Sequence, residues 1–507
     1  MSLPLWLILS GAFLLTALGT AVALLATRSV LRHRLRRWAR TTLWQFRSRV
    51  DRYKLVERDR IREALLADPG ISAAIAEHAA AHGMADSEVR IRVNQYIDEI
   101  VPFFNVLSYY RIGYNLSRLL INLLYKSTIE YRDQPALDRM PRRDVVVYLM
   151  NHRSNADYVV LAYVMARMVS ISYAVGEWAR VWPLEFVFKS FGSYFIRRRF
   201  REPLYHTVLE RYVQLITRNG VTQGLFPEGG LTRDGALRPV KLGLLDYIVR
   251  TLEDPGFDRD IWLVPVGINY DRVLEDRSLI RERIVGGRRP GRIRQFTHVL
   301  SYLGWNLGRF LTGQLRRYGR VAVAFGTPIS VRGWLAEQPP GVLALPKAER
   351  LPHVQRLAEH ALERIGAVIP VTPVPLAAAA LLSFGASVVP RARVLEGMER
   401  LRSRRVGRDA KLVREELPIE EVWERAWLML RMRRLVVASG DDLVILPDSR
   451  PLLEYYANSI RHLLPEQEAV AWSPAAESDP TLPRLATREE MDIRTREHPV
   501  VRRNPSS

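Results

Sequence analysis

The sequence contains no cysteine. This absence excludes disulfide bonds, a thiolate nucleophile and every zinc site that needs a cysteine ligand. A chain without disulfides also fits a reducing compartment. Any catalytic group must therefore come from hydroxyl, imidazole, carboxylate or amine side chains.

Acidic side chains are the second scarcity. The 507 residues carry 54 Asp and Glu against 75 Lys and Arg, which gives a formal net charge of +21. Such an excess favours a polyanionic partner, namely nucleic acid, an anionic membrane surface, or a phosphorylated or CoA-type substrate. No nucleic-acid-binding motif occurs, and the arginine clusters follow an apolar segment or candidate strands. We therefore expect anionic membrane lipids and a phosphorylated substrate as partners, and no nucleic acid.

The N-terminus has one long uncharged run. Residues 2–27 contain no charged side chain, and a helix through them would exceed a bilayer core of about 30 Å. A cleaved signal peptide is the alternative, but it would need a basic segment before the apolar one. Arginines cluster from Arg28 onward, which predicts a cytoplasmic location for the rest of the chain. We predict a transmembrane anchor over residues 1–27, then a basic amphipathic and helical segment over residues 28–140.

Residues 144–157, DVVVYLMNHRSNAD, combine a buried strand with a polar turn. The apolar residues 145–150 predict a strand, and Asp157 falls in the first turn of the apolar helix that follows. This places His152 and Asp157 at the carboxyl edge of a sheet, where open α/β folds bind their ligands. An aspartate that holds one imidazole nitrogen leaves the other free to accept a proton. The alternative is a structural histidine beside a helix-capping aspartate.

Strand and helix patterns alternate through the middle of the chain. This alternation predicts an α/β domain over residues 141–335, with a mostly parallel sheet flanked by helices. Residues 336–472 predict a mainly helical C-terminal domain with a short strand pair, and residues 473–507 a disordered tail. Within that domain the uncharged residues 371–390 contain prolines and predict a packed helix, with a membrane-embedded element as the alternative. The further strands are predicted at residues 171–176, 193–198, 221–230, 261–270 and 321–331.

Cationic and glycine-rich groups follow several of these strands. Paired guanidinium groups bind phosphate bidentately, and glycines let a ligand approach the backbone closely. Together they suit a hydroxyl nucleophile carried by a phosphorylated substrate. Taken singly, the arginines could be solvated, the glycines a simple turn and the lysine a surface residue. The residues concerned are Arg197, Arg198, Glu228, Gly229, Gly230, Arg233 and Lys241, with Pro265 at a predicted strand end beside the site.

Four stretches in order, NHRSNADYVVLAYV, GSYFIRRRF, LFPEGGLTRDG and VPVGINYDRV, resemble the motifs of the glycerolipid acyltransferase family. The Phe-Ile-Arg-Arg and Glu-Gly-Gly forms are most similar to its bacterial membrane-bound glycerol-3-phosphate acyltransferase branch. The strong resemblance covers about residues 145–331, and a weaker one covers residues 444–464.

The resemblance implies transfer of a fatty acyl group from acyl-CoA or acyl-carrier protein to the sn-1 hydroxyl of glycerol 3-phosphate, the first step of phospholipid synthesis. His152 would be the general base and Asp157 would orient it, with no metal and no cofactor. Pro265 would shape the acyl-donor side. We expect a cell inner membrane protein, single-pass or membrane-associated, with a cytoplasmic catalytic domain. The implied glycerol-phosphate site comprises Arg197, Arg198, Glu228, Gly229, Gly230 and Arg233, with Lys241 as an addition.

The chain departs from the family pattern at two places. Leu231 stands where an arginine usually follows Glu-Gly-Gly, and Asn155 stands where a second histidine is common. One phosphate contact is then absent or supplied from elsewhere, with Arg197, Arg199 and Lys241 as sources. Acceptors that stay open are 1-acylglycerol 3-phosphate and dihydroxyacetone phosphate. A catalytically inactive membrane scaffold or lipid-binding protein is the alternative of another class.

Overall fold

The computed structural model describes residues 52–105, 113–165, 171–180, 184–198, 200–285, 308, 319–403 and 412–464. The predicted transmembrane anchor and the predicted disordered tail lie outside these residues. Within the described ranges, no helix is both long enough and apolar enough to cross a bilayer.

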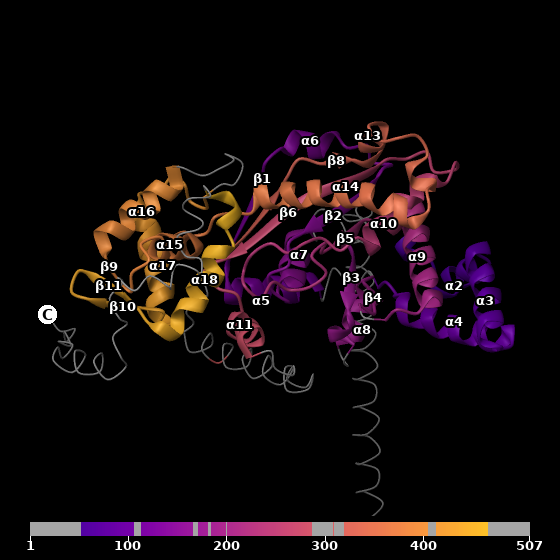
Figure 1. Ribbon diagram of the computed structural model, residues 1–507, viewed down its shortest axis with the longest axis horizontal. Helices are drawn as coiled ribbons and strands as arrows, with labels where there is room; N and C mark the ends of the chain where they lie inside the picture. Colours follow the sequence, from indigo (N-terminus) through magenta and orange to yellow (C-terminus); the bar gives the residue numbers. More distant parts are fainter. Residues whose placement is uncertain are drawn as a thin grey trace, which may run out of the picture.

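A central sheet of eight strands organises the molecule (Figure 1). Its order is β1-β7-β6-β2-β5-β3-β4, with β8 beside β6. Strands β7 and β8 run antiparallel to β6, whereas the other paired strands are parallel, so the predicted mostly parallel sheet is confirmed. The strands are β1 (Lys126–Tyr131), β2 (Val145–Met150), β3 (Ser172–Gly176), β4 (Tyr194–Ile196), β5 (Gln223–Leu225), β6 (Ile261–Tyr270), β7 (Arg320–Phe325) and β8 (Ile329–Ser330).

Strand β1 corrects the predicted domain boundary. The sequence placed its residues in a helical segment that ended at residue 140, yet β1 pairs in parallel with β7 at the edge of the sheet. Its residues KSTIEY are exposed or half-buried along their whole length. An edge strand of this kind does not need the apolar run that identifies an internal strand. The sheet domain therefore begins at Lys126.

Helices cover both faces of the sheet, as the alternation of side chains along β2 shows. Val145, Val147 and Leu149 belong to one apolar core, whereas Tyr148 and Met150 belong to the other. This two-residue period places successive side chains on opposite faces. The described helices before α14 are α2 (Arg58–Leu66), α3 (Pro69–His82), α4 (Asp86–Ile100), α5 (Tyr114–Leu124), α6 (Gln134–Arg139), α7 (Asp157–Met165), α8 (Leu184–Ser190), α9 (Pro203–Arg218), α10 (Gly243–Val249), α11 (Asp276–Val285) and α13 (Val331–Ala336).

Helix α14 (Lys347–Val368) also belongs to the sheet domain. The sequence assigned it to the C-terminal domain, but Val354 and Leu357 share a core with Val145 and Val147 of β2. The helix crosses the sheet in Figure 1. Its apolar stripe indicates an amphipathic helix but not which surface it covers, so its residues alone did not fix the boundary.

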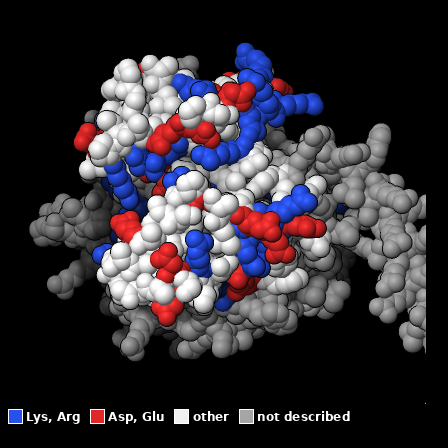
Figure 2. Space-filling view, turned by 90° about the vertical axis from the view of Figure 1, so that its right-hand side faces the viewer, with Lys and Arg blue, Asp and Glu red and all other residues white. Residues whose placement is uncertain are grey.

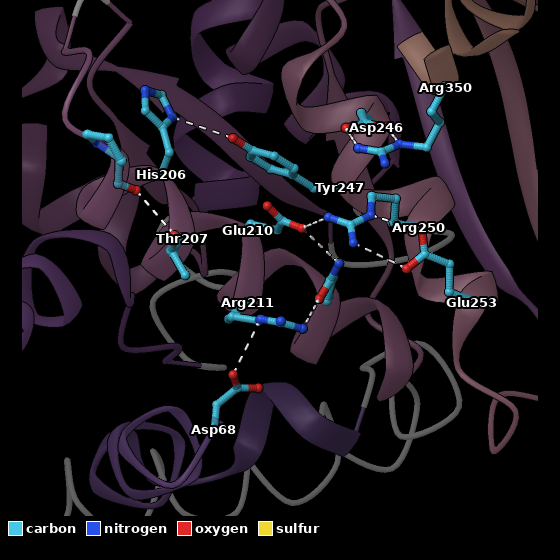
Figure 3. A network of polar contacts seen from close by, with 12 residues as sticks. Asp68, His206, Thr207, Glu210, Arg211, Asp246, Tyr247, Arg250, Glu253 and Arg350 are labelled. Atoms are coloured by element: carbon cyan, nitrogen blue, oxygen red, sulfur yellow. Dashed lines mark hydrogen bonds and ion pairs between the residues drawn. The ribbon is translucent and has the colours of Figure 1, made fainter. Parts of the chain in front are cut away.

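Polar contacts fasten this helical layer together (Figure 3). Arg350 of α14 makes a buried bidentate pair with Asp246 of α10, with distances of 2.9 and 3.1 Å. Arg211 of α9 lies 3.3 Å from Asp68, which caps α3 through the backbone N–H groups of Gly70 and Ile71. The N-terminal helices are thereby tied to the sheet domain through α9.

The C-terminal region packs around α15 (Pro373–Leu382), in which every residue is buried. Its apolar residues belong to the same core as Tyr148 and Met150, so the packed helix predicted for residues 371–390 is confirmed over residues 373–382, whereas residues 388–390 form a strand. Four consecutive alanines allow neighbouring helices to approach closely. The predicted strand pair is also present and gains a third strand. These elements are α16 (Arg391–Ser403), α17 (Ile419–Met432), α18 (Arg450–Asn458), β9 (Val388–Pro390), β10 (Val436–Ser439) and β11 (Asp442–Ile445).

Charges of both signs are interspersed on the side that faces the viewer in Figure 2. This is the side that carries α2 to α4 at the right of Figure 1. On it, Arg58 and Arg62 both lie against Asp98.

Candidate active site

The catalytic pair predicted from the sequence forms where β2 ends. His152 follows Met150 by two residues, and Asp157 is the first residue of α7. The Nδ1 atom of His152 lies 2.9 Å from the Oδ2 atom of Asp157. Both side chains are at most 1% exposed. With Nδ1 donating to the carboxylate, Nε2 carries the lone pair, and no described residue hydrogen-bonds to it.

Asp157 is held rigidly by three further donors. The backbone N–H groups of Arg153 and Ser154 donate to Oδ2 at 2.8 and 3.0 Å, and the hydroxyl of Tyr270 donates to Oδ1 at 2.5 Å. The aspartate therefore both closes the turn and orients the imidazole. Tyr270, at the end of β6, was not predicted, because only the pairing of β2 with β6 brings it to Asp157.

The surroundings keep His152 neutral. Burial lowers the pKa of His152 and the positive charge of Arg198 lowers it further, while Asp157 acts in the opposite direction. The net pKa is below the ordinary value of 6.5. The imidazole also stacks on the ring of Phe226, with 4.0 Å between ring centroids. A neutral imidazole is the form that can accept a proton from a hydroxyl group.

Glu228 joins the turn that carries His152 to the turn at Gly229 and Gly230, called the glycine turn below. One carboxylate oxygen accepts the backbone N–H of His152 at 2.8 Å, and the other accepts the backbone N–H of Arg238 at 2.8 Å. Burial raises the pKa of Glu228 to about 7, although both hydrogen bonds act against the rise. The sequence predicted a ligand contact for this carboxylate, and the structure places both of its oxygens on the backbone.

Three cationic side chains gather around Gly229 and Gly230. Gly229 has a left-handed φ of 66°, and a Cβ atom there would lie 2.8 Å from Cγ of Lys241. A Cβ atom on Gly230 would lie 3.2 Å from Nη1 of Arg238 and 3.5 Å from Nη1 of Arg198. The glycines thus leave room between Arg198, Arg238 and Lys241. Among the described residues, no carboxylate forms a salt bridge with these three side chains.

Two other predicted phosphate ligands are paired with acids. Arg197 donates to both carboxylate oxygens of the buried Glu99, and its guanidinium lies 4.7 Å from the ring of Phe200. Arg233 donates to Glu282 at 3.3 Å. Arg197 therefore fastens β4 to α4, and it is not the free cation that could stand in for the absent arginine at position 231.

Pro265 is not at a strand end, contrary to the sequence prediction. It lies in the middle of β6, beside Leu149 of β2. The pairing of β6 with β8 ends at Leu263 and that with β7 begins at Val266. A proline fits here because no ladder needs its missing N–H. Its carbonyl accepts the N–H of Gly326 at 2.8 Å.

Residues that the sequence did not single out contact the turn that carries His152. Glu275 accepts the hydroxyl of Ser154 at 2.6 Å and the N–H of Asn155 at 3.2 Å. The guanidinium of Arg153 lies 5.1 Å from the ring of Tyr455, which belongs to α18. Asp157 and Glu275 are separated by more than a hundred residues, so sequence spacing gave no indication of their proximity. In the described part of the chain, no group of three His, Asp or Glu side chains could hold a metal ion.

Two family models match the chain. Residues 134–269 match the model described as "Acyltransferase", which includes the His152 turn and the Glu228 turn. Residues 305–485 match the model described as "Glycerol-3-phosphate acyltransferase C-terminal region". The chain therefore carries two regions that match acyltransferase family models, and the resemblance expected from the four motifs is confirmed.

Curated relatives carry the name "Glycerol-3-phosphate acyltransferase". The one from Aeromonas hydrophila is 32% identical over 365 residues, which covers 70% of this chain and 44% of that protein. The one from Alteromonas mediterranea is 25% identical over 453 residues, covering 85% and 52%. The chain spans about half the length of the curated relatives it matches. The solved 1-acyl-sn-glycerophosphate (LPA) acyltransferase PlsC from Thermotoga maritima aligns with a TM-score of 0.29 and 16% identity, covering 50% of this chain and 77% of that one.

Proposed function

We propose that this protein is a glycerol-3-phosphate 1-O-acyltransferase. The observation that supports this most directly is the Glu228 bridge, which joins the His152–Asp157 pair to a turn lined by three cations. A base and an anion site connected by one carboxylate suit a substrate that carries both a hydroxyl and a phosphate. The names of the relatives supply the acceptor.

In the proposed mechanism, Nε2 of His152 accepts the proton of the sn-1 hydroxyl while that oxygen attacks the thioester carbonyl carbon. The tetrahedral intermediate then collapses, the carbon–sulfur bond breaks, and the thiolate takes the proton back from the imidazolium. Asp157 stabilises the transient positive charge of His152 through the 2.9 Å contact with Nδ1. The acyl group passes directly from donor to acceptor without a covalent enzyme intermediate.

The donor in this proposal is acyl-CoA or acyl-carrier protein, both of which present a thioester. The acceptor 1-acylglycerol 3-phosphate is the second candidate, because Leu231 stands in place of the usual arginine of the glycerol-3-phosphate branch. Dihydroxyacetone phosphate is the remaining acceptor. An inactive scaffold is disfavoured by the intact hydrogen bonds of the His152–Asp157 pair.

For the location, we propose the cell inner membrane, with the catalytic domain in the cytoplasm. The proposal depends on the uncharged residues 2–27 and the arginines that follow them, which suit a membrane anchor and contact with anionic lipids. Protease accessibility of the sheet domain in inverted membrane vesicles, compared with intact spheroplasts, tests this orientation.

The test of function is acyl transfer by purified, lipid-supported protein. Labelled glycerol 3-phosphate and 1-acylglycerol 3-phosphate are each offered with acyl-CoA and with acyl-carrier protein, beside a His152→Ala variant. We expect acylation of glycerol 3-phosphate that the variant has lost, with its fold and membrane fractionation unchanged. Acylation of the lysophospholipid alone would change the acceptor, and no reaction with either would favour the scaffold.

A further inference from the structure

The turn at Gly229 and Gly230 lacks one cation that the family pattern places there. Leu231 stands where the family pattern has an arginine, and its side chain packs against the apolar core. A cation at position 231 would have to leave that packing, so a phosphate at this turn needs another source of positive charge. Arg197 is committed to Glu99, and Arg233 is paired with Glu282.

We propose that Arg238 replaces the absent arginine and binds the phosphate of the acceptor, together with Arg198 and Lys241. This inference rests on the proposed function and assigns the residue that confers phosphate recognition. Arg238 follows the glycine turn by eight residues, outside the four motifs, and nothing in its spacing marks it as part of the site.

The position of Arg238 is defined by two contacts. Its backbone N–H donates to Oε2 of Glu228 at 2.8 Å, and its Nη1 donates to the carbonyl oxygen of Leu231 at 3.2 Å. The second contact brings its guanidinium to position 231, although the side chain of Leu231 points into the core. The remaining guanidinium N–H groups have no hydrogen-bond partner among the described residues. They provide the planar fork that binds phosphate.

The geometry also relates Arg238 to the base. The same Glu228 carboxylate holds the N–H of His152 on its other oxygen. Arg198 completes the arrangement, because Cβ atoms on Gly176 and Gly230 would lie 2.9 Å from its Nε and 3.5 Å from its Nη1. Arg198 is thus placed between the end of β3 and the glycine turn, close enough to lower the pKa of His152.

The experiment is steady-state kinetics of the full-length, lipid-supported protein with Arg238→Ala, Arg238→Lys and Arg233→Ala. We expect Arg238→Ala to raise the KM for glycerol 3-phosphate about 10- to 100-fold, which is the usual effect of losing a charge-assisted contact. The donor KM should change less than about twofold, since the donor does not use this fork. Arg238→Lys should recover part of the loss because it keeps the charge. Arg402→Ala is the matched control, because Arg402 also donates to a backbone carbonyl, that of Leu417, in the C-terminal region.

The inference is overturned if Arg238→Ala raises the KM for glycerol 3-phosphate and the KM for the acyl donor equally. It is also overturned if Arg233→Ala raises the KM for glycerol 3-phosphate more than Arg238→Ala does. Either result leaves the proposed function intact. If the wild type acylates no acceptor, the proposed function fails instead. Titration of the His152→Ala protein with inorganic phosphate and with glycerol 3-phosphate still tests the site, because binding does not require the base. If adding Arg238→Ala to the His152→Ala protein abolishes this binding, the assignment is supported. If binding is unchanged, the assignment is refuted.

Discussion

Replacing Glu228 by glutamine tests whether this carboxylate holds the backbone of the site or contacts the substrate. The carboxylate accepts two backbone N–H groups, from His152 and Arg238, each at 2.8 Å. A glutamine side chain has one oxygen and one NH2 group, so one of the two N–H groups loses its acceptor and faces another donor. A hydrogen bond to a charged group contributes about 1.5–3 kcal/mol, which corresponds to about a 10- to 100-fold loss in kcat/KM.

The effect of Glu228→Gln on stability should be much smaller. Burial raises the pKa of Glu228 from 4.5 to about 7, which corresponds to about 3 kcal/mol against the ionised form in the folded state. Glutamine removes this cost while it loses one hydrogen bond, and the two changes nearly cancel above pH 7. Because the folded-state pKa is raised, the wild type loses stability as pH rises from 4.5 through about 7. The glutamine variant lacks this dependence.

The assay pairs acyl-transfer kinetics at about pH 8, above the pKa of Glu228, with thermal unfolding across the range from 4.5 to 7. We expect the stability of Glu228→Gln relative to wild type to increase as pH rises, while kcat/KM is reduced. Glu282→Gln is the control, because its half-exposed pair with Arg233 is worth only about 0–1 kcal/mol. Unchanged kcat/KM, or a stability difference independent of pH, would refute the anchoring role.

Two other predictions concern the base. The kcat/KM of the wild type should rise with pH and level off with an apparent pKa below 6.5, since burial and Arg198 lower the pKa of His152. In Arg198→Ala this rise should occur at higher pH, because the positive charge that lowers the pKa is gone. A pH–rate profile that does not move would contradict the assignment of His152 as the base. Tyr270→Phe removes one hydrogen bond from Asp157 and should lower kcat about tenfold, with the circular dichroism spectrum unchanged. If the variant keeps the kcat of the wild type, the other three hydrogen bonds suffice to hold Asp157.

The sequence by itself indicated that His152 and Asp157 lie together at the end of a strand, and it indicated the class of fold. Residues 145–150 form a short, β-branched apolar run that ends in a polar turn, which favours a buried strand, and His152 and Asp157 follow directly. Patterns of this kind depend only on residues close together in the chain, so they can be recognised without knowledge of the tertiary packing. The apolar composition around α15 likewise predicted a packed helix, but a membrane-embedded element stayed open until the structure showed every residue of α15 buried.

Only the tertiary structure decided which polar groups meet. The arginines at positions 197 and 198 are adjacent in sequence, yet one pairs with Glu99 and the other lies beside Gly230. Arg238 carries no sequence signal, because its role comes from the Glu228 carboxylate and the carbonyl of Leu231. Composition and spacing specify what a side chain can bind. Its actual partner depends on strand order and loop conformation, which are set by contacts between residues far apart in the chain.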